Sequence, residues 1–94
     1  MRVGGMKKPP NETLLKALAA EIKSLRTGLG ISQEELAHRA GLNRTFVGRL
    51  EVAQTQPSIT VLFQLADALE VDIVALVANI IKRKKKEQGS RGHR

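Results

Sequence analysis

The chain contains two short helical segments joined by only a few residues, and this pair restricts the folds that it can adopt. The run Ser32-Gln33-Glu34-Glu35 has the pattern of a capping box, in which the serine hydroxyl accepts from the amide three residues on and the second glutamate reaches back. It predicts a helix that continues to Ala40 and ends at Gly41, which can take a positive φ. Asn43 is a good N-cap for the next helix. Because the connection is so short, the two helices must cross steeply.

Three further helices are expected around this pair. Apolar residues over 14–29 recur at spacings of three and four, the pattern of one helical face. Ser58 and Asp72 are N-caps for a fourth and a fifth helix, and a loop over 52–56 is closed by Pro57, which disfavours helix in the residue before it. No stretch alternates apolar and polar residues for long enough to indicate a strand. The sequence therefore predicts an all-α domain of five helices.

The positive charge is concentrated at the two ends of the chain. The formal net charge of +7 comprises +3 in residues 1–11, −2 in residues 12–81 and +6 in residues 82–94. We expect a flexible lead-in over 1–11, a folded domain over 12–83 and a flexible basic tail over 84–94, so both basic ends are predicted to be disordered. Charge placed in this way can add sequence-independent affinity for phosphate, or it can equally serve as a solubilising end.

The composition disfavours several classes of function. The chain has no Cys, which excludes disulfides, thiolate nucleophiles and Cys-ligated zinc. His38 has two glutamates one helical turn back but no evident third ligand or nucleophile, and His93 is nearly terminal. We therefore expect no enzymatic activity, no bound metal and no cofactor. No apolar run reaches the length of about 18 residues that a membrane span needs, so we expect a cytoplasmic protein without a membrane partner.

The second helix of the central pair has an outward face whose chemistry suits DNA. In such a helix-turn-helix Val47 and Leu50 face the core, whereas Arg44, Thr45 and Arg49 project outward. Arginine can bind guanine O6 and N7 together, and threonine offers a hydroxyl with a methyl that can meet thymine. Each such pairing contributes about 1–3 kcal/mol. On an arbitrary helix, the same arginines would more often be solvated surface.

Several short motifs occur here in the order in which one known family has them. They are Leu25-Arg26, the run from Ile31 to Ala37, Ala40-Gly41-Leu42, Leu50-Glu51 and Pro57-Ser58. Together they resemble the phage-repressor and Cro type of helix-turn-helix DNA-binding domain, over roughly residues 14–77. Within that family, the run 43–48 resembles the recognition helix of the short controller proteins of restriction-modification systems.

The resemblance implies roles for individual residues. It places the base-reading positions at Arg44, Thr45 and Arg49. It makes Gln33 the residue that meets a DNA phosphate and braces the recognition helix, and it implies a largely buried ion pair between Arg26 and Glu51. We group Asn43 and Phe46 with Gln33 as residues that contact phosphate or brace the helix, although Phe46 fits the core equally well.

The loop after the recognition helix departs from the family, in which this loop is commonly basic and contains glycine. Here it reads Val52-Ala53-Gln54-Thr55-Gln56, without a cation, so it offers phosphates only uncharged hydrogen bonds. We expect the basic ends of the chain to compensate. Deletion of residues 82–94 should then flatten the salt dependence of DNA binding.

The last predicted helix is apolar most of the way round. Residues 73–81 are apolar at every position except Asn79, and a domain of about 70 residues has no centre deep enough to enclose such a helix. We therefore predict a homodimer, with some of the following residues facing the core and others the partner: Ile73, Leu76, Val77, Ile80 and Ile81. The alternative is a core helix with a few exposed apolar residues.

These features together predict a homodimeric, sequence-specific transcriptional regulator of double-stranded DNA. Its operator would be an inverted repeat with half-sites about 10 base pairs apart. An alternative is an antitoxin-like or adaptor module that uses the same scaffold to bind another protein, which the neutral loop and the acidic middle of the chain favour. A third possibility is nonspecific nucleic-acid binding through the basic ends alone.

Overall fold

The computed structural model describes the backbone of residues 12–92 and the side chains of residues 12–86. Within this range the chain forms five helices and no strand, which confirms the predicted all-α fold. The helices are, in chain order, α1 (Glu12–Gly28), α2 (Gln33–Ala40), α3 (Arg44–Glu51), α4 (Ile59–Ala68) and α5 (Ile73–Gly92). No helix in this part of the chain is long and apolar enough to cross a membrane.

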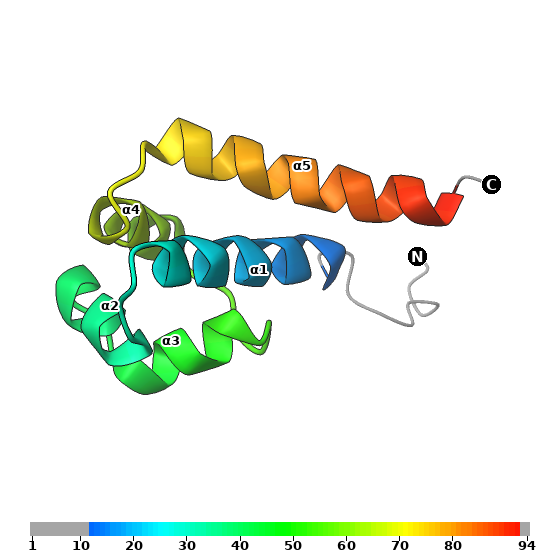
Figure 1. Cartoon of the computed structure of the whole chain (residues 1–94). Helices are drawn as coiled ribbons and strands as arrows, with labels where there is room; N and C mark the ends of the chain where they lie inside the picture. Colours follow the sequence, from blue (N-terminus) through cyan, green and yellow to red (C-terminus); the bar gives the residue numbers. More distant parts are fainter. Residues whose placement is uncertain (1–11, 93–94) are drawn as a thin grey trace.

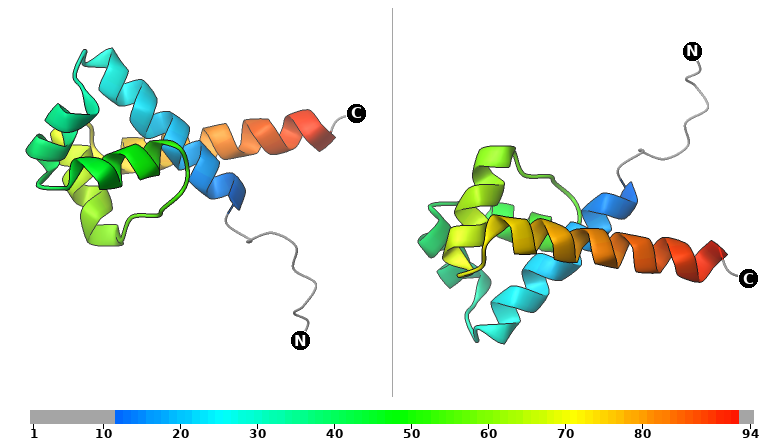
Figure 2. Two further views of the ribbon diagram at one scale, coloured as in Figure 1. Left: turned by 90° about the horizontal axis from the view of Figure 1, so that it is seen from below. Right: turned by 90° about the horizontal axis from the view of Figure 1, so that it is seen from above.

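Helix α1 is the central element of the fold. In Figure 1, α5 lies along one side of α1, and α2 and α3 lie on the opposite side. Figure 2 shows that α1 and α5 cross at an angle when they are viewed along the perpendicular direction. Helix α4 packs against both α2 and α5, so it joins the two sides of the bundle.

The core forms where the five helices meet. Each helix contributes at least one side chain that is fully buried; examples, in chain order, are Ile22, Leu36, Leu50, Leu65 and Leu76. Full burial of a side chain of this size contributes about 1.5–3 kcal/mol relative to exposure, before the cost of ordering the chain. The short helices α2 and α3 are therefore held by packing, because helices of eight residues are unstable on their own.

The N-termini of three helices have the caps that the sequence predicts. The Ser32 hydroxyl accepts from the Glu35 amide at 3.0 Å, which starts α2. Asn43 Oδ1 accepts from the Thr45 amide at 2.7 Å at the start of α3, and the Ser58 hydroxyl accepts from an α4 amide at 3.1 Å. These bonds satisfy amides that have no partner inside the helix. The boundaries of the helix-turn-helix are thus set locally by the sequence.

The C-termini of four helices share one turn, in which a backbone amide donates to the carbonyl five residues back. Gly30 and Gly41 take the left-handed conformation after α1 and α2, with φ of 72° and 69°. After α3 and α4 the same conformation is taken by Ala53, with φ of 61°, and by Glu70, with φ of 62°. A residue with a Cβ adopts it at a cost of about 1–2 kcal/mol. The end of α3 therefore carries no glycine signal in the sequence.

Helix α5 is longer than predicted. A flexible tail is predicted from residue 84, but α5 continues to Gly92, so the predicted boundary at residues 83–84 lies inside a helix. The run over 82–87 consists of Lys, Arg and Glu, which are strong helix formers, and no proline interrupts it. The predicted lead-in over 1–11 and the last two residues lie outside the described range.

Candidate nucleic-acid interface

The turn between α2 and α3 is fixed by hydrogen bonds on two sides. On one side, the Leu42 amide donates to the Ala37 carbonyl at 2.8 Å, and Gly41 supplies the left-handed residue. On the other side, Gln64 from α4 donates from Nε2 to the Ala40 carbonyl at 3.0 Å. This second bond was not foreseen from the sequence, because it joins residues 24 positions apart. The crossing of α2 and α3 is therefore held from outside the helix pair as well as within it.

Helix α3 has one buried face and one exposed face. Val47 and Leu50 are fully buried, whereas Arg44, Thr45 and Arg49 are exposed, as the outward-face prediction requires. The structure thus brings the three predicted base-reading residues together on one surface, which we call the α3 outer face. Because the backbone behind them is packed into the core, their Cα positions are fixed relative to one another.

Asn43 and Phe46 contribute mainly to the local structure of α3. The side chain of Asn43 is exposed, and its Oδ1 is used to cap the helix. Phe46 is half-buried and packs against the core cluster, which supports the core alternative for this residue. Both residues therefore help to orient α3.

Glu51 is the centre of a hydrogen-bonded cluster that joins three helices. Arg26 donates from Nε to Glu51 Oε2 at 2.6 Å and from Nη2 to Oε1 at 3.0 Å, so the predicted ion pair is present and bidentate. Arg26 also donates from Nη1 to the Ile31 carbonyl at 2.8 Å. Gln33 donates from Nε2 to Glu51 Oε1 at 2.9 Å. The last turn of α3 is therefore tied both to α1 and to the start of α2.

Glu51 and Arg26 each compensate the cost of burying the other. Glu51 is 7% exposed, and burial of an unpaired carboxylate would be costly. The hydrogen bond that Arg26 donates to Glu51 raises the pKa of the Arg26 guanidinium above its ordinary value, against the lowering effect of burial.

Gln33 lies beside Gly48 as well, since a Cβ built on Gly48 would be 3.6 Å from Gln33 Oε1. Gln33 thus braces α3, as the sequence-based interpretation proposed.

The segment after α3 offers no positive charge. Residues 52–56 are neutral, and Val52 and Gln54 are exposed. The positive charge of the α3 outer face therefore comes from Arg44 and Arg49 of α3 itself, and the segment that follows adds none. Contacts from this segment to a phosphate would be uncharged hydrogen bonds.

A second buried carboxylate was missed by the sequence analysis. Glu21 on α1 is 6% exposed and accepts from Arg83 Nε at 2.6 Å and from Asn79 Nδ2 at 3.1 Å. In the sequence, Arg83 is one of several charges of the basic end, and Asn79 is only an interruption of an apolar run. Both residues attach α5 to α1. A usable signal was their spacing of four, which places them on one face of α5.

The predicted dimer residues of α5 divide into two groups. Leu76 and Ile80 are buried in the core of the same chain, so they are unavailable to a partner, and Ile73 is half-buried. Val77 and Ile81 are exposed. Val74, which the prediction omitted, is 70% exposed. The large exposed apolar side chains of α5 in the described part of the chain are therefore those of Val74, Val77 and Ile81.

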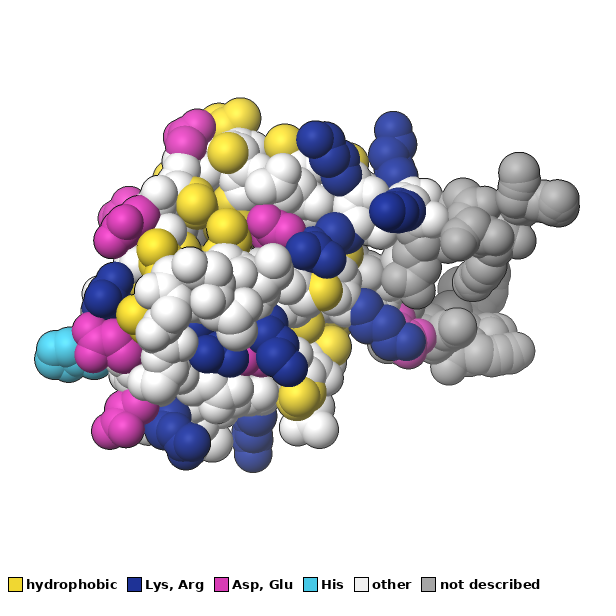
Figure 3. Space-filling model, viewed as in Figure 1, with side chains coloured by type: hydrophobic (Ala, Val, Ile, Leu, Met, Phe, Trp, Pro, Cys, Tyr) yellow, Lys and Arg dark blue, Asp and Glu magenta, His cyan; other side chains and the backbone are white. Residues whose placement is uncertain are grey.

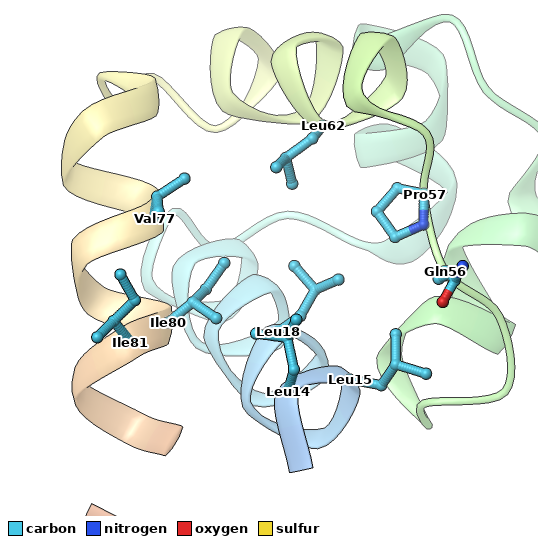
Figure 4. Close-up of a pocket in the computed structure, with 9 residues that line it drawn as sticks. All are labelled: Leu14, Leu15, Leu18, Gln56, Pro57, Leu62, Val77, Ile80 and Ile81. Atoms are coloured by element: carbon cyan, nitrogen blue, oxygen red, sulfur yellow. The ribbon is translucent and has the colours of Figure 1, made fainter. Parts of the chain in front are cut away.

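An apolar groove of about 410 Å³ lies between α1, α5 and the segment before α4. Figure 4 shows leucines of α1 facing isoleucines of α5 across it, with Leu62 and Pro57 at its other end. Val77 and Ile81 line both this groove and the exposed surface of α5. The groove therefore extends the apolar surface that α5 presents.

A helix-turn-helix family model matches residues 22–76, a range that contains α2, the turn and α3. The chain belongs to the helix-turn-helix family. This agrees with the resemblance inferred from the motifs and with the five-helix fold.

Several helix-turn-helix relatives of this chain are controller proteins of restriction-modification systems. The control protein C.SmaI of Serratia marcescens is 35% identical over 72 residues, which cover 77% of this chain and 83% of that protein. The crystal structure of the controller C.AhdI from Aeromonas hydrophila has a TM-score of 0.64 and 37% identity, over 66% of this chain and 94% of that one. The controller C.Esp1396I, crystallised as a tetramer with its natural 35 base-pair operator, has a TM-score of 0.71 and 31% identity, over 76% and 93% of the two chains.

Proposed function

We propose that this helix-turn-helix protein is a cytoplasmic, non-enzymatic regulator of transcription that binds double-stranded DNA in a sequence-specific manner. The observation that carries the proposal is the α3 outer face, where Arg44, Thr45 and Arg49 are exposed together on a helix whose opposite face is fully buried. The similarity to C.Esp1396I, a controller crystallised with its operator, supports the same role for this chain.

In this proposal the three exposed side chains read bases in the major groove. Arg44 and Arg49 can each donate two hydrogen bonds to guanine, and Thr45 can contact thymine through its methyl group. Gln33 stands at the start of α2, where backbone amides attract phosphate, while its side chain braces α3 through Glu51. Precise readout requires a rigid helix, and the buried Arg26–Glu51 pair supplies that rigidity.

We further propose that the regulator acts as a homodimer through α5. The exposed Val74, Val77 and Ile81 and the adjoining groove provide apolar surface that a monomer would leave in water. A two-fold pair of α3 helices would meet successive major grooves about 34 Å apart, which matches an inverted-repeat operator. Linking two half-site interactions also makes occupancy rise steeply with protein concentration.

The proposal is tested by binding to duplex DNA from immediately upstream of the gene, compared with a scrambled duplex of equal length at near-physiological salt. The wild-type protein should prefer the first duplex by about a thousandfold. Arg44→Ala should remove about 1–3 kcal/mol of that preference. Arg44→Lys should retain weak binding to both duplexes but lose the preference, because lysine keeps the charge and lacks the bidentate fork.

The matched control for charge is Lys23→Ala, which removes one exposed cation from α1. It should leave the preference intact. Full preference in Arg44→Ala would show that the site is assigned wrongly. Equal, weak binding of both duplexes by the wild-type protein would favour the protein-binding alternative, to which the neutral segment 52–56 already points.

Dimerisation is tested separately by sedimentation equilibrium. Val74→Asp places a charge on the exposed part of α5 and should convert the dimer to monomers. Val52→Asp is the matched control, because Val52 is similarly exposed, at 62% against 70%, but lies after α3. Equal dimerisation of both variants would contradict an interface on α5.

A further inference from the structure

The second half of α5 carries a run of cations beyond the part of the chain that the family model matches. That match ends at residue 76, whereas residues 82–86 are all Lys or Arg. Lys82, Lys85 and Lys86 are exposed. In Figure 3, basic side chains lie further along α5 than the hydrophobic ones of its first half. This charge therefore lies outside the matched helix-turn-helix unit.

Part of this basic surface forms a shallow hollow beside α1. The hollow has a volume of about 380 Å³, and its lining residues are Glu21, Asn79, Lys82, Arg83 and Lys86. Glu21 accepts from both Arg83 and Asn79, so its negative charge is already compensated. Arg83 uses its Nε for this bond, and its side chain is 40% exposed. The outer end of the guanidinium is therefore accessible from the hollow.

The two lysines of the hollow have no acidic partner. Among the residues whose side chains are described, neither Lys82 nor Lys86 forms an ion pair. They are four residues apart, so they project from the same side of α5, where like charges repel each other. An anion bound between them would remove this repulsion. The hollow therefore has the charge and the donors of an anion site.

We propose that Lys82, Lys86 and the outer end of Arg83 bind phosphate groups of a second DNA segment, independently of its sequence. The inference rests on the proposed function, in which the α3 outer face holds the operator. Lysine and arginine are the side chains that proteins use to bind phosphate. The hollow is too shallow to enclose a small anion, and the net charge of +6 over residues 82–94 extends beyond it. These two features favour a polyanion, whose binding also releases counterions.

The position of the hollow separates it from the operator duplex. In Figure 1, α5 and α3 lie on opposite sides of α1, and α1 packs against both. Packed helices have axes about 8–10 Å apart, so the axes of α3 and α5 are about 16–20 Å apart. That distance exceeds the screening length of about 8–10 Å at physiological salt. A straight duplex in contact with the α3 outer face is therefore out of reach of Lys82 and Lys86.

The proposed homodimer would leave the hollow open. Around the axis of α5, Lys82 and Lys86 are turned by about 140° and 180° from Val77, which belongs to the exposed apolar surface. One face of α5 can thus contact a second copy of the chain while another binds phosphate. A regulator bound at its operator would then be able to hold a further stretch of DNA.

The test is a capture experiment with the full chain. Protein is bound to an immobilised operator duplex, unbound protein is washed away, and a labelled random-sequence duplex is added. Wild type should retain the second duplex. The double variant Lys82→Gln with Lys86→Gln should retain it about tenfold more weakly at about 0.1 M salt. The logarithmic slope of retention against salt should also fall by about 2, one for each lysine.

The matched control is Lys16→Gln with Lys23→Gln, which changes the net charge equally. Both lysines are exposed on α1 and are turned by at least about 140° from Glu21 around that helix. This variant should retain the second duplex like the wild type. Equal loss in both double variants would show that net charge alone is responsible and would overturn the site. Complete release of the second duplex by inorganic phosphate at constant ionic strength would overturn the polyanion as its ligand.

The remaining outcomes separate this inference from the proposed function. Wild type that holds the operator but retains no second duplex would overturn the inference alone. A flatter salt dependence of operator binding itself in Lys82→Gln with Lys86→Gln would place these cations on the operator duplex, as the sequence-based hypothesis for the basic end expects, and would overturn the second segment. If wild type does not prefer the operator, the proposed function fails. Direct titration with the random duplex then still tests the hollow, and equal affinity of wild type and double variant would overturn it.

Discussion

The Arg83 guanidinium lies 2.6 Å from the Glu21 carboxylate, which joins the second half of α5 to α1. Glu21 is almost fully buried, and Asn79 donates to its other oxygen at 3.1 Å. One of the cations at the basic end of the chain is therefore structural. Since α5 carries the proposed dimer surface, this pair also sets the position of that surface relative to the α3 outer face on the far side of α1.

Arg83→Ala should lower the free energy of unfolding by about 1–3 kcal/mol, because Glu21 remains buried with only one donor. Arg83 is partly exposed, so water that enters will offset some of the loss. Lys82→Ala, at the exposed neighbouring position, should change stability by less than about 0.5 kcal/mol. Urea unfolding at equal protein concentration gives the free energy of unfolding of Arg83→Ala and of Lys82→Ala for comparison. Equal stability of the two variants would mean that the ion pair contributes nothing.

Glu51→Ala should destabilise the domain by about 3–5 kcal/mol, since it strands the Arg26 guanidinium and removes the acceptor for Gln33. Loss of DNA binding by this variant would then report unfolding. The double variant Arg26→Met with Glu51→Leu should recover part of the stability, because no buried charge is left unpaired. Thermal unfolding followed by circular dichroism tests this. A double variant less stable than the single one would contradict the explanation.

The contribution of Arg26 to stability should not change across the neutral and moderately alkaline range. Its pKa is raised by the hydrogen bond to Glu51, so its stabilising effect is fully present below the ordinary arginine pKa and declines only as the pH rises beyond it. The difference in unfolding free energy between wild type and Arg26→Met should therefore be constant from about pH 7 to pH 10. A difference that falls within this range would show that another group titrates with the pair.

Gly41→Ala and Ala53→Gly should shift stability in opposite directions. Both positions take the left-handed conformation, with φ of 69° and 61°. Alanine at 41 should cost about 1–2 kcal/mol, and glycine at 53 should gain about 0.5–1 kcal/mol after its greater unfolded-state entropy is deducted. Gly28→Ala is the control, because a Cβ there meets nothing within 4 Å and φ is not positive. Chemical denaturation measures the free energy of unfolding of all three variants. A Gly41→Ala variant that is more stable than the wild type would refute the prediction.

The parts of the fold that the sequence could predict are those with local causes. Ser32, Asn43 and Ser58 cap their helices through amides two or three residues away, so the pattern of residue types is sufficient. The exposed face of α3 likewise follows from helical periodicity. The end of α3 was located only through Pro57, because Ala53 occupies a conformation that normally favours glycine.

The parts that could not be predicted depend on contacts between distant residues. Glu21 and Arg83 are 62 positions apart, and nothing in either local sequence indicates the other. The division of α5 into the buried Leu76 and Ile80 and the exposed Val77 and Ile81 depends on how that helix packs on α1. Phe46 was equally compatible with core and DNA until the packing of α3 was known.

Gly48→Ala should raise stability and lower operator affinity together. Gly48 lies on the α3 outer face between the turns that carry Thr45 and Arg49, and glycine inside a helix costs about 1 kcal/mol relative to alanine. An added Cβ would be 3.6 Å from the Gln33 side chain, an ordinary contact, so the fold itself does not require glycine there. The added methyl group would, however, project from the centre of the surface proposed to read bases.

Urea unfolding and operator titration of Gly48→Ala measure the two effects on one preparation. We expect a gain of about 0.5–1 kcal/mol in unfolding free energy with a loss of affinity for the operator but not for scrambled DNA. Gly28→Ala, at the end of α1, provides the comparison in which affinity should not change. Unchanged operator affinity in Gly48→Ala would mean that the glycine is merely tolerated and that the DNA backbone and bases stay clear of this turn. Higher stability together with a weaker preference for the operator would instead place Gly48 where α3 comes closest to the DNA.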